Sequence, residues 1–310
     1  MKSIDLGHYQ SLFCKKLADD GKSFNTIKNY RTDLNIFMQF LAIKGQKSVI
    51  TAITHEQLKE YNKYLSQKYS SPNSIRRRIQ ALRMFFDYLV AQNIYPDNPV
   101  KKMLVSPKVV DLPNPPEFHV IKAVFESLNP ELSHKHFDKL LNLRNRVLIQ
   151  LIYGGGLKVS HIENLRAEHI QLYKKEYRIL VAPEKRDPFT ISMPKEFNSL
   201  HLEYSEALLK QKQKDDIDFS HYLFNGNPYR ILSGGLSARG IEVIFKEYSR
   251  LFDIQLTAKN IRQACIFKWL GQDRPEARIK EWMGVQPQYS LKPYRDLLEL
   301  QPNKYCYLEL

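Results

Sequence analysis

A run of prolines divides this chain. Residues 94–118, IYPDNPVKKMLVSPKVVDLPNPPEF, contain six prolines. Proline fixes φ and lacks a backbone N–H, so neither a long helix nor a central strand is compatible with this density. The run therefore predicts an extended linker between two domains, which a length of 310 residues also favours. We set the limits at 1–95 for the first domain, 96–116 for the linker and 117–310 for the second domain.

The first domain is expected to be helical. In residues 25–45 six apolar side chains recur with helical spacing, and Gly45 ends the segment. They are Ile27, Tyr30, Leu34, Phe37, Met38 and Leu41. Thr54 is a good N-cap for a second helix. A third helix is predicted over residues 71–93, and its apolar stripe is Ile75, Ile79, Leu82, Phe86 and Leu89.

The second domain is expected to be mixed but mostly helical. Two strands are predicted, YRILVA (177–182) and FTISMP (189–194), with PEKRDP as their turn. Helices are predicted over residues 137–156, 158–170, 195–214, 237–252, 257–272 and 274–284. The fold class is therefore mainly α, with a helical first domain and a small β-sheet in the second.

The charge indicates a polyanionic partner. The net charge is +14, and residues 1–110 contribute +10 of it, with 18 Lys and Arg against 8 Asp and Glu. A basic excess concentrated in one region favours a dedicated binding surface over a uniformly solvated one.

Other classes of protein are disfavoured. No apolar run of 18 residues predicts a membrane span, and the N-terminus has no apolar core typical of a secretory signal. Three scattered cysteines and nine histidines form no metal-binding pattern. We expect no cofactor, no metal and a cytoplasmic, nucleoid-associated protein.

Four arginines gather on the third predicted helix, namely Arg76, Arg77, Arg78 and Arg83. Such a cluster is often only a solvated helix face. Here the stretch from Ser66 to Val90 holds a single acid, Asp87, so no local group is expected to neutralise these charges and phosphate is the expected partner. Lys28, Lys101, Lys102 and Arg186 complete the predicted DNA contacts.

Several segments together resemble the tyrosine recombinase (phage integrase) family, closest to its Xer-like members. SFNTIKNYRTDLNIFMQFL and SPNSIRRRIQALRMFFDYLV resemble helices of that family's four-helix, SAM-like core-binding domain. LIYGGGLKVSHIENLRAEHI, TAKNIRQACIFKWLGQ and WMGVQPQYSLKPY resemble boxes of its catalytic domain, in the same order. The resemblance implies a catalytic domain over residues 117–310.

The family's chemistry is attack of a tyrosine oxygen on a DNA phosphate, which leaves a 3′-phosphotyrosine and requires neither metal nor ATP. Two arginines suit the charge that develops on the phosphate. The resemblance places the nucleophile at Tyr294, ten residues after Gly284, rather than at Tyr289. It places the second arginine at Arg262.

The other family positions depart from the pattern. The first arginine is Lys158, and the acid three residues later is His161. The family's histidines around Arg262 are replaced by Lys259 and Gln263, and the donor after Gly284 is replaced by Val285. Lys259 remains a candidate general acid in a rewired site.

The family's hairpin lysine is assigned to Lys185, with Glu184 as the gapless alternative and Arg186 in reserve. The C-terminal segment NKYCYLEL either packs on its own chain or docks on a neighbouring subunit, as is common in the family.

Two functions follow from these residues. The first is binding of double-stranded DNA by a recombinase relative whose strand cleavage is impaired or lost, with an architectural, regulatory or accessory role. The alternative is an active site-specific recombinase that uses Tyr294. The expected partners are duplex DNA and either further copies of the chain, as a dimer or tetramer on DNA, or an active partner recombinase.

Overall fold

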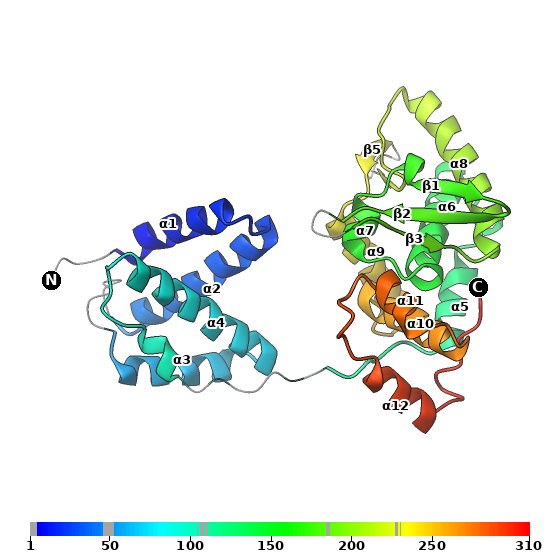
Figure 1. The fold of residues 1–310 in the computed structure, drawn as a ribbon. Helices are drawn as coiled ribbons and strands as arrows, with labels where there is room; N and C mark the ends of the chain where they lie inside the picture. The colour runs from blue at the N-terminus through cyan, green and yellow to red at the C-terminus, as the bar shows by residue number, and fades with distance from the viewer. Residues whose placement is uncertain are drawn as a thin grey trace. The chain divides into compact units, whose positions relative to one another are not determined.

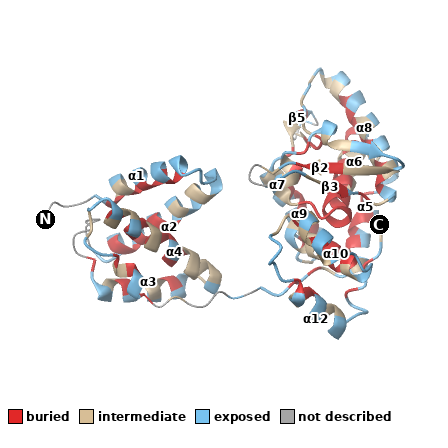
Figure 2. Ribbon diagram, in the orientation of Figure 1, coloured by how far each residue is buried: buried red, intermediate tan, exposed pale blue. Residues whose placement is uncertain are grey.

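The computed structural model describes residues 5–45, 53–103, 105, 109, 111–183, 187–226, 229 and 231–310. The chain forms two compact units, Met1–Asp111 and Leu112–Leu310 (Figure 1). Each unit has a hydrophobic core of its own, which Figure 2 shows as buried residues along the inner sides of its helices. Among the described residues, no helix combines the length and hydrophobicity that a bilayer span requires.

The first unit is a four-helix domain, as the family resemblance implies. Its helices are α1 (Leu6–Asp19), α2 (Phe24–Ile43), α3 (His55–Lys68) and α4 (Pro72–Ala91). Each follows a residue whose side chain accepts a hydrogen bond from a backbone N–H of the first turn. At Thr54 the backbone N–H also donates to the side-chain oxygen of Gln57, which completes a capping box. The predicted N-cap at Thr54 is therefore confirmed.

The apolar stripe predicted on α4 forms the centre of the first core. Four of its members are almost fully buried: Ile79, Leu82, Phe86 and Leu89. They pack with α2, where Leu34, Phe37 and Leu41 are buried as expected. Helical periodicity in these segments thus identified the faces that join the helices.

Part of the predicted linker packs on this unit. A short 3₁₀ helix, η2 (Pro99–Lys102), follows Asn98, whose side-chain amide donates to the Arg83 carbonyl and to Asp87, at 2.8 Å each. Val100 is fully buried in the first core. Residues 98–103 are therefore tied to α4, although proline density suggested an extended segment; the linker limits themselves stay a prediction.

The second unit combines helices with two small sheets. Its longer helices are α5 (Phe118–Ser127), α6 (His136–Ile149), α8 (Glu196–Asp215), α9 (Ala238–Leu251), α10 (Ala258–Gly271) and α12 (Lys292–Leu300). The shorter ones are η3 (Pro130–Leu132), the π-helical turn η4 (Gln150–Gly154), α7 (Val159–Glu163), η5 (Ala167–His169) and α11 (Glu276–Trp282).

The larger sheet has the antiparallel order β1 (Ile170–Tyr173), β2 (Glu176–Val181) and β3 (Phe189–Ser192). β2 and β3 confirm the two predicted strands, and their paired residues Ile179 and Ile191 are fully buried. The sequence did not predict β1, α12 or the smaller pair β4 (Phe224–Gly226) and β5 (Leu232–Gly235).

Helix α10 runs through the centre of the second core. Ala264, Cys265, Ile266 and Phe267 are almost fully buried on successive sides of it. The chain turns towards α10 after η4, at Gly156, where φ is +64° and an added Cβ would lie 2.3 Å from the Trp269 ring. The glycine run after α6 is thus required for close packing on α10.

Candidate functional site

Two basic side chains converge on the loop between α11 and α12. Lys158, the residue before α7, donates from Nζ to the carbonyl oxygen of Gly284 at 3.0 Å. Arg262, on α10, donates from Nη2 to the Met283 carbonyl at 2.7 Å and from Nε to the Gly156 carbonyl at 2.5 Å. Segments that are distant in the sequence therefore meet around residues 283–284.

The absence of a side chain at Gly284 lets Lys158 and His161 approach the backbone of this loop. Its φ is +56°, which favours glycine, and an added Cβ would lie 3.4 Å from Lys158 Nζ and 3.9 Å from His161 Cε1. The Phe189 ring of β3 closes the same space at 3.8 Å. The site is thus assembled from α7, β3, α10 and the loop after α11.

The electrostatics of this cluster favour an anion. Burial first, and then the charges of Lys158 and Arg262, together lower the pKa of His161 to about 4. Burial also lowers the pKa of Arg262, which as a guanidinium nevertheless stays protonated. A phosphate oxygen placed here would face two cations and a neutral imidazole.

Tyr294 lies beside this cluster, on the first turn of α12. Its side chain is only 6% exposed and packs against Phe267, with the ring centroids 5.2 Å apart. Burial raises its pKa well above the usual range, the neighbouring Tyr289 raises it further, and Arg262 and Gln263 lower it. Tyr289 is more accessible, at 39%. The assignment of the nucleophile to Tyr294 rather than Tyr289 stays a prediction.

The substituted family positions have other surroundings. Gln263 accepts a hydrogen bond from the backbone N–H of Asn114 at 3.1 Å, and Val285 is half-buried against the core. Lys259 is exposed at the start of α10. Glu184, Lys185 and Arg186 lie outside the described residues, so the predicted hairpin lysine has no structural account here.

The arginine cluster of the first unit requires a correction. Asp33 on α2 is 1% exposed, and its Oδ1 lies 3.0 Å from Arg77 Nη2 and 3.8 Å from Arg78 Nε. Arg78 is itself buried, and its guanidinium covers the Tyr69 ring at 3.5 Å. The sequence excluded only a local compensating acid, and the acid that the structure supplies is more than forty residues away in sequence. We therefore assign Arg78 a structural role.

The other predicted DNA contacts are more accessible. Arg76 and Arg83 are half-buried, and Lys28, Lys101 and Lys102 are exposed. Lys101 forms an ion pair with Asp87 at 3.1 Å. These residues stay predictions for the nucleic-acid surface of the first unit.

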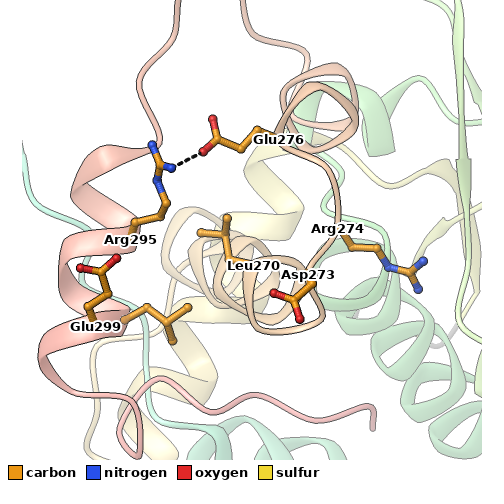
Figure 3. A pocket seen from close by; sticks show the side chains of 7 residues that line it. Leu270, Asp273, Arg274, Glu276, Arg295 and Glu299 are labelled. Atoms are coloured by element: carbon orange, nitrogen blue, oxygen red, sulfur yellow. Dashed lines mark ion pairs between the residues drawn. The ribbon is translucent and has the colours of Figure 1, made fainter.

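An ion pair connects helix α12 to α11. Arg295, which follows Tyr294, forms an ion pair with Glu276 at 2.9 Å. The pair lies at a cavity of about 300 Å³ between α11, α12 and the end of α10, which Figure 3 shows. The cavity is lined by Leu270, Asp273, Arg274, Glu276, Arg295, Leu298 and Glu299.

The C-terminal segment packs on its own chain. Glu309 pairs with Lys268, which is 1% exposed, at 2.6 Å. Tyr305 stacks on Phe267 with centroids 4.4 Å apart, and the Leu308 carbonyl accepts from the Tyr153 hydroxyl at 2.5 Å. The segment thus packs on its own chain in this structure, and docking on a neighbouring subunit stays a prediction. Within the described residues, no group of three or more His, Cys, Asp or Glu side chains is placed to hold a metal ion.

Comparisons with known proteins agree with this arrangement. The family model "Phage integrase, N-terminal SAM-like domain" matches residues 11–93. The tyrosine recombinase XerD of Vibrio cholerae is 27% identical over 219 residues, which cover 70% of this chain and 69% of that protein. The tyrosine recombinase XerC of Myxococcus xanthus is 33% identical over 153 residues, 48% of this chain and 47% of the relative. This second match therefore spans about half of the curated protein.

Solved structures share the fold. The XerH recombinase bound to a palindromic difH substrate, in a post-cleavage complex, superposes with a TM-score of 0.68 at 16% identity, covering 94% of this chain and 80% of that one. A lambda integrase (75–356) dimer bound to a COC′ core site gives 0.63 at 14% identity, covering 91% and 96%.

Proposed function

Because this chain is an Xer-like protein of the tyrosine recombinase (phage integrase) family, we propose that it binds duplex DNA and that its strand cleavage is impaired. The observation that carries the proposal is the convergence of Lys158 and Arg262 on residues 283–284, beside Val285. The site keeps its cations and has an apolar side chain where the family has a donor. Its role would be architectural, regulatory or accessory to an active partner.

Charge and similarity support the DNA-binding part of the proposal. The net charge of +14 is concentrated in the first third of the chain, and a surface of this kind attracts phosphate through release of condensed counterions. The structural neighbours include recombinases solved on DNA, such as XerH on a difH substrate and lambda integrase on a core site. In this proposal both units contribute contacts to the duplex.

The chemistry of the substituted positions supports the impaired-cleavage part. Removing one donor aimed at transition-state charge commonly lowers a rate by about 10²- to 10³-fold. Lys158 supplies a point charge where the family's arginine supplies a planar pair of donors. Gln263 shares its side-chain oxygen with the Asn114 backbone, and Val285 cannot donate. These losses leave phosphate binding better supported than its cleavage.

An active recombinase is the second candidate. It is favoured by the interaction between Arg262 and the buried hydroxyl of Tyr294, which brings the predicted nucleophile to the basic cluster. In that case Tyr294 attacks the phosphate and the 5′-hydroxyl leaves, and the 5′-hydroxyl of the partner strand then attacks the phosphotyrosine and releases the tyrosine. Lys259, exposed at the start of α10, is the candidate general acid.

One experiment separates the two candidates. The preferred duplex is recovered by in vitro selection, and a nicked suicide version of it is incubated with the protein. Impaired cleavage predicts salt-dependent binding with little covalent adduct. An abundant adduct that disappears in Tyr294→Phe would instead establish the active recombinase. Affinity for the selected duplex that does not change with salt would rule out a phosphate-binding surface altogether.

The oligomeric state on DNA is also proposed from the structural neighbours. Lambda integrase has been solved as a dimer on a core site and as a tetramer on a Holliday junction. We extend this to the present chain, which would act as a dimer or tetramer on DNA or beside an active partner recombinase. Sedimentation of the protein with the selected duplex measures the stoichiometry directly.

A further inference from the structure

His161 lies at the phosphate site although the residue pattern of the family has an acid there. It is the third residue of α7, and its Nδ1 atom is 3.5 Å from the backbone N–H of Lys158, which orients the ring. Its Cε1 atom points to Gly284, and its ring meets Phe189 edge-on with centroids 6.1 Å apart. The imidazole is thus fixed between α7, β3 and the loop that carries Val285.

The backbone contact selects one tautomer. An Nδ1 atom that accepts from the Lys158 N–H has no proton of its own, so the proton of a neutral ring is on Nε2. Nε2 adjoins Cε1, the ring atom that lies 3.9 Å from a Cβ added at Gly284. A neutral ring of this tautomer therefore has its N–H donor next to the atom that approaches the loop on which Lys158 and Arg262 converge.

The surroundings keep the imidazole neutral. The charged groups that act on it in the described part of the chain are Lys158, at the start of α7, and Arg262, on α10; β3 contributes the apolar Phe189 and the α11–α12 loop contributes Gly284. Both charges are positive, and together with burial they lower the pKa of His161 to about 4. At neutral pH a donor is present without an added charge.

We propose that His161 is a neutral hydrogen-bond donor to the bound DNA phosphate, and that it replaces the donor missing at Val285. The proposal rests on the proposed function, because it requires a phosphate between Lys158 and Arg262. In the family pattern the donor stands at the position of Val285, after α11. In this proposal the donor comes instead from α7, which carries His161.

The first test reads the tautomer directly. Protein labelled with ¹⁵N-histidine is followed by long-range ¹⁵N–¹H spectra between pH 5.5 and 8, with the His161 signals assigned from His161→Gln. We expect the Nε2–H tautomer with no titration in this range, and a downfield shift of the Nε2 proton when the selected duplex is added. An Nδ1–H tautomer, a midpoint above pH 6, or bound duplex without a shift would overturn the proposal.

The second test uses paired substitutions. Glutamine places its amide near the Nε2 position, whereas asparagine reaches only the Nδ1 position. We expect His161→Asn to lower affinity for the selected duplex about tenfold, as for one hydrogen bond to a charged group, and His161→Gln to stay within about threefold of the unmodified protein. His119→Asn, at an exposed histidine of α5, is the matched control and should change nothing.

Thermal unfolding of both variants excludes a folding defect. Equal loss in His161→Asn and His161→Gln would reject the donor role while leaving DNA binding itself intact. Absence of salt-dependent binding by the unmodified protein would reject the proposed function, and the inference with it.

Discussion

The Nζ atom of Lys158 lies 3.0 Å from the carbonyl oxygen of Gly284, a residue 126 positions further along the chain. This contact joins the first box of the family resemblance to the loop that precedes the predicted nucleophile. A lysine reaches the carbonyl as a compact charge, whereas an arginine would reach the same space with a planar set of donors. The nature of this one side chain therefore bears on both binding and cleavage.

Lys158→Ala is expected to weaken binding of the selected duplex about tenfold and to reduce the slope of log K against log salt by about one. The physical reason is the loss of one cation at the phosphate. Fluorescence anisotropy over a series of salt concentrations measures both quantities. Lys210→Ala, at an exposed lysine of α8, controls for the change in net charge. An unaltered slope would remove Lys158 from the interface.

Lys158→Arg is expected to act on cleavage instead. The arginine restores the bidentate donor set of the family pattern, so the yield of covalent adduct should rise by about an order of magnitude. Affinity should change little, because the charge is the same. If adduct formation falls in this variant, the lysine is part of a rewired site and the impaired-cleavage proposal loses its main chemical argument.

Tyr294→Phe separates the two tyrosines of the α11–α12 region. The substitution keeps the ring that packs on Phe267, so the fold should persist, and it removes the hydroxyl that would attack. Any covalent adduct on a suicide duplex should disappear in Tyr294→Phe and persist in Tyr289→Phe. Gel analysis after denaturation reports the adduct. The reverse pattern would transfer the nucleophile to Tyr289.

Most helices could be predicted from the sequence because their signals are local. The apolar stripe of α4 and the capping box at Thr54 both lie within a few residues of the structure that they determine. The strands β2 and β3 alternate around the buried pair Ile179 and Ile191, which is likewise a local pattern. In contrast, β5 has the sequence LSGG, whose two glycines are typical of a turn, and only pairing with β4 makes it a strand.

The site was less predictable because its contacts are not local. The motif order indicated Lys158 and Arg262, but nothing near them in the sequence specifies that both reach residues 283–284. Asp33 was missed for the same reason, since its partner Arg77 is on another helix. His161 was visible only as a departure from a pattern, and its role depends on a ring orientation that the fold imposes.

Arg77→Ala is expected to destabilise the first unit by about 1–2 kcal/mol. The variant leaves the buried carboxylate of Asp33 with Arg78 alone, at 3.8 Å. The partial exposure of Arg77 makes the loss smaller than for a fully buried pair. Native-state hydrogen exchange of α2 and α4 amides measures it. Arg76→Ala, one residue earlier on α4, should change stability by less than about 0.5 kcal/mol. Equal effects would mean that the ion pair has no net role.

The pair Arg295–Glu276 is expected to orient α12. Arg295→Glu should lower adduct formation by Tyr294, because like charges push α12 away from α11, and the reversed pair Arg295→Glu with Glu276→Arg should recover it. Both side chains are partly exposed, so the coupling free energy should be about 0.5–1 kcal/mol. A double-mutant cycle on adduct yield and on urea unfolding measures it. A coupling free energy near zero would show that the packing of Tyr294 on Phe267 holds the helix alone.

Glu309→Gln is expected to destabilise the second unit more than any other surface substitution considered. Lys268 is 1% exposed on the central helix α10, and Glu309 is its partner at 2.6 Å. Removing one member of a buried pair leaves an uncompensated charge, here about 2–4 kcal/mol after allowing for the partial exposure of Glu309. Glu299→Gln, at an exposed acid of α12, is the control.

The double variant Lys268→Met with Glu309→Met removes both charges and should recover most of the stability, because neither partner is left unpaired. Urea unfolding of the four proteins measures the series. If the double variant is as unstable as Glu309→Gln, the C-terminal segment is held by the stacking of Tyr305 on Phe267 rather than by the ion pair.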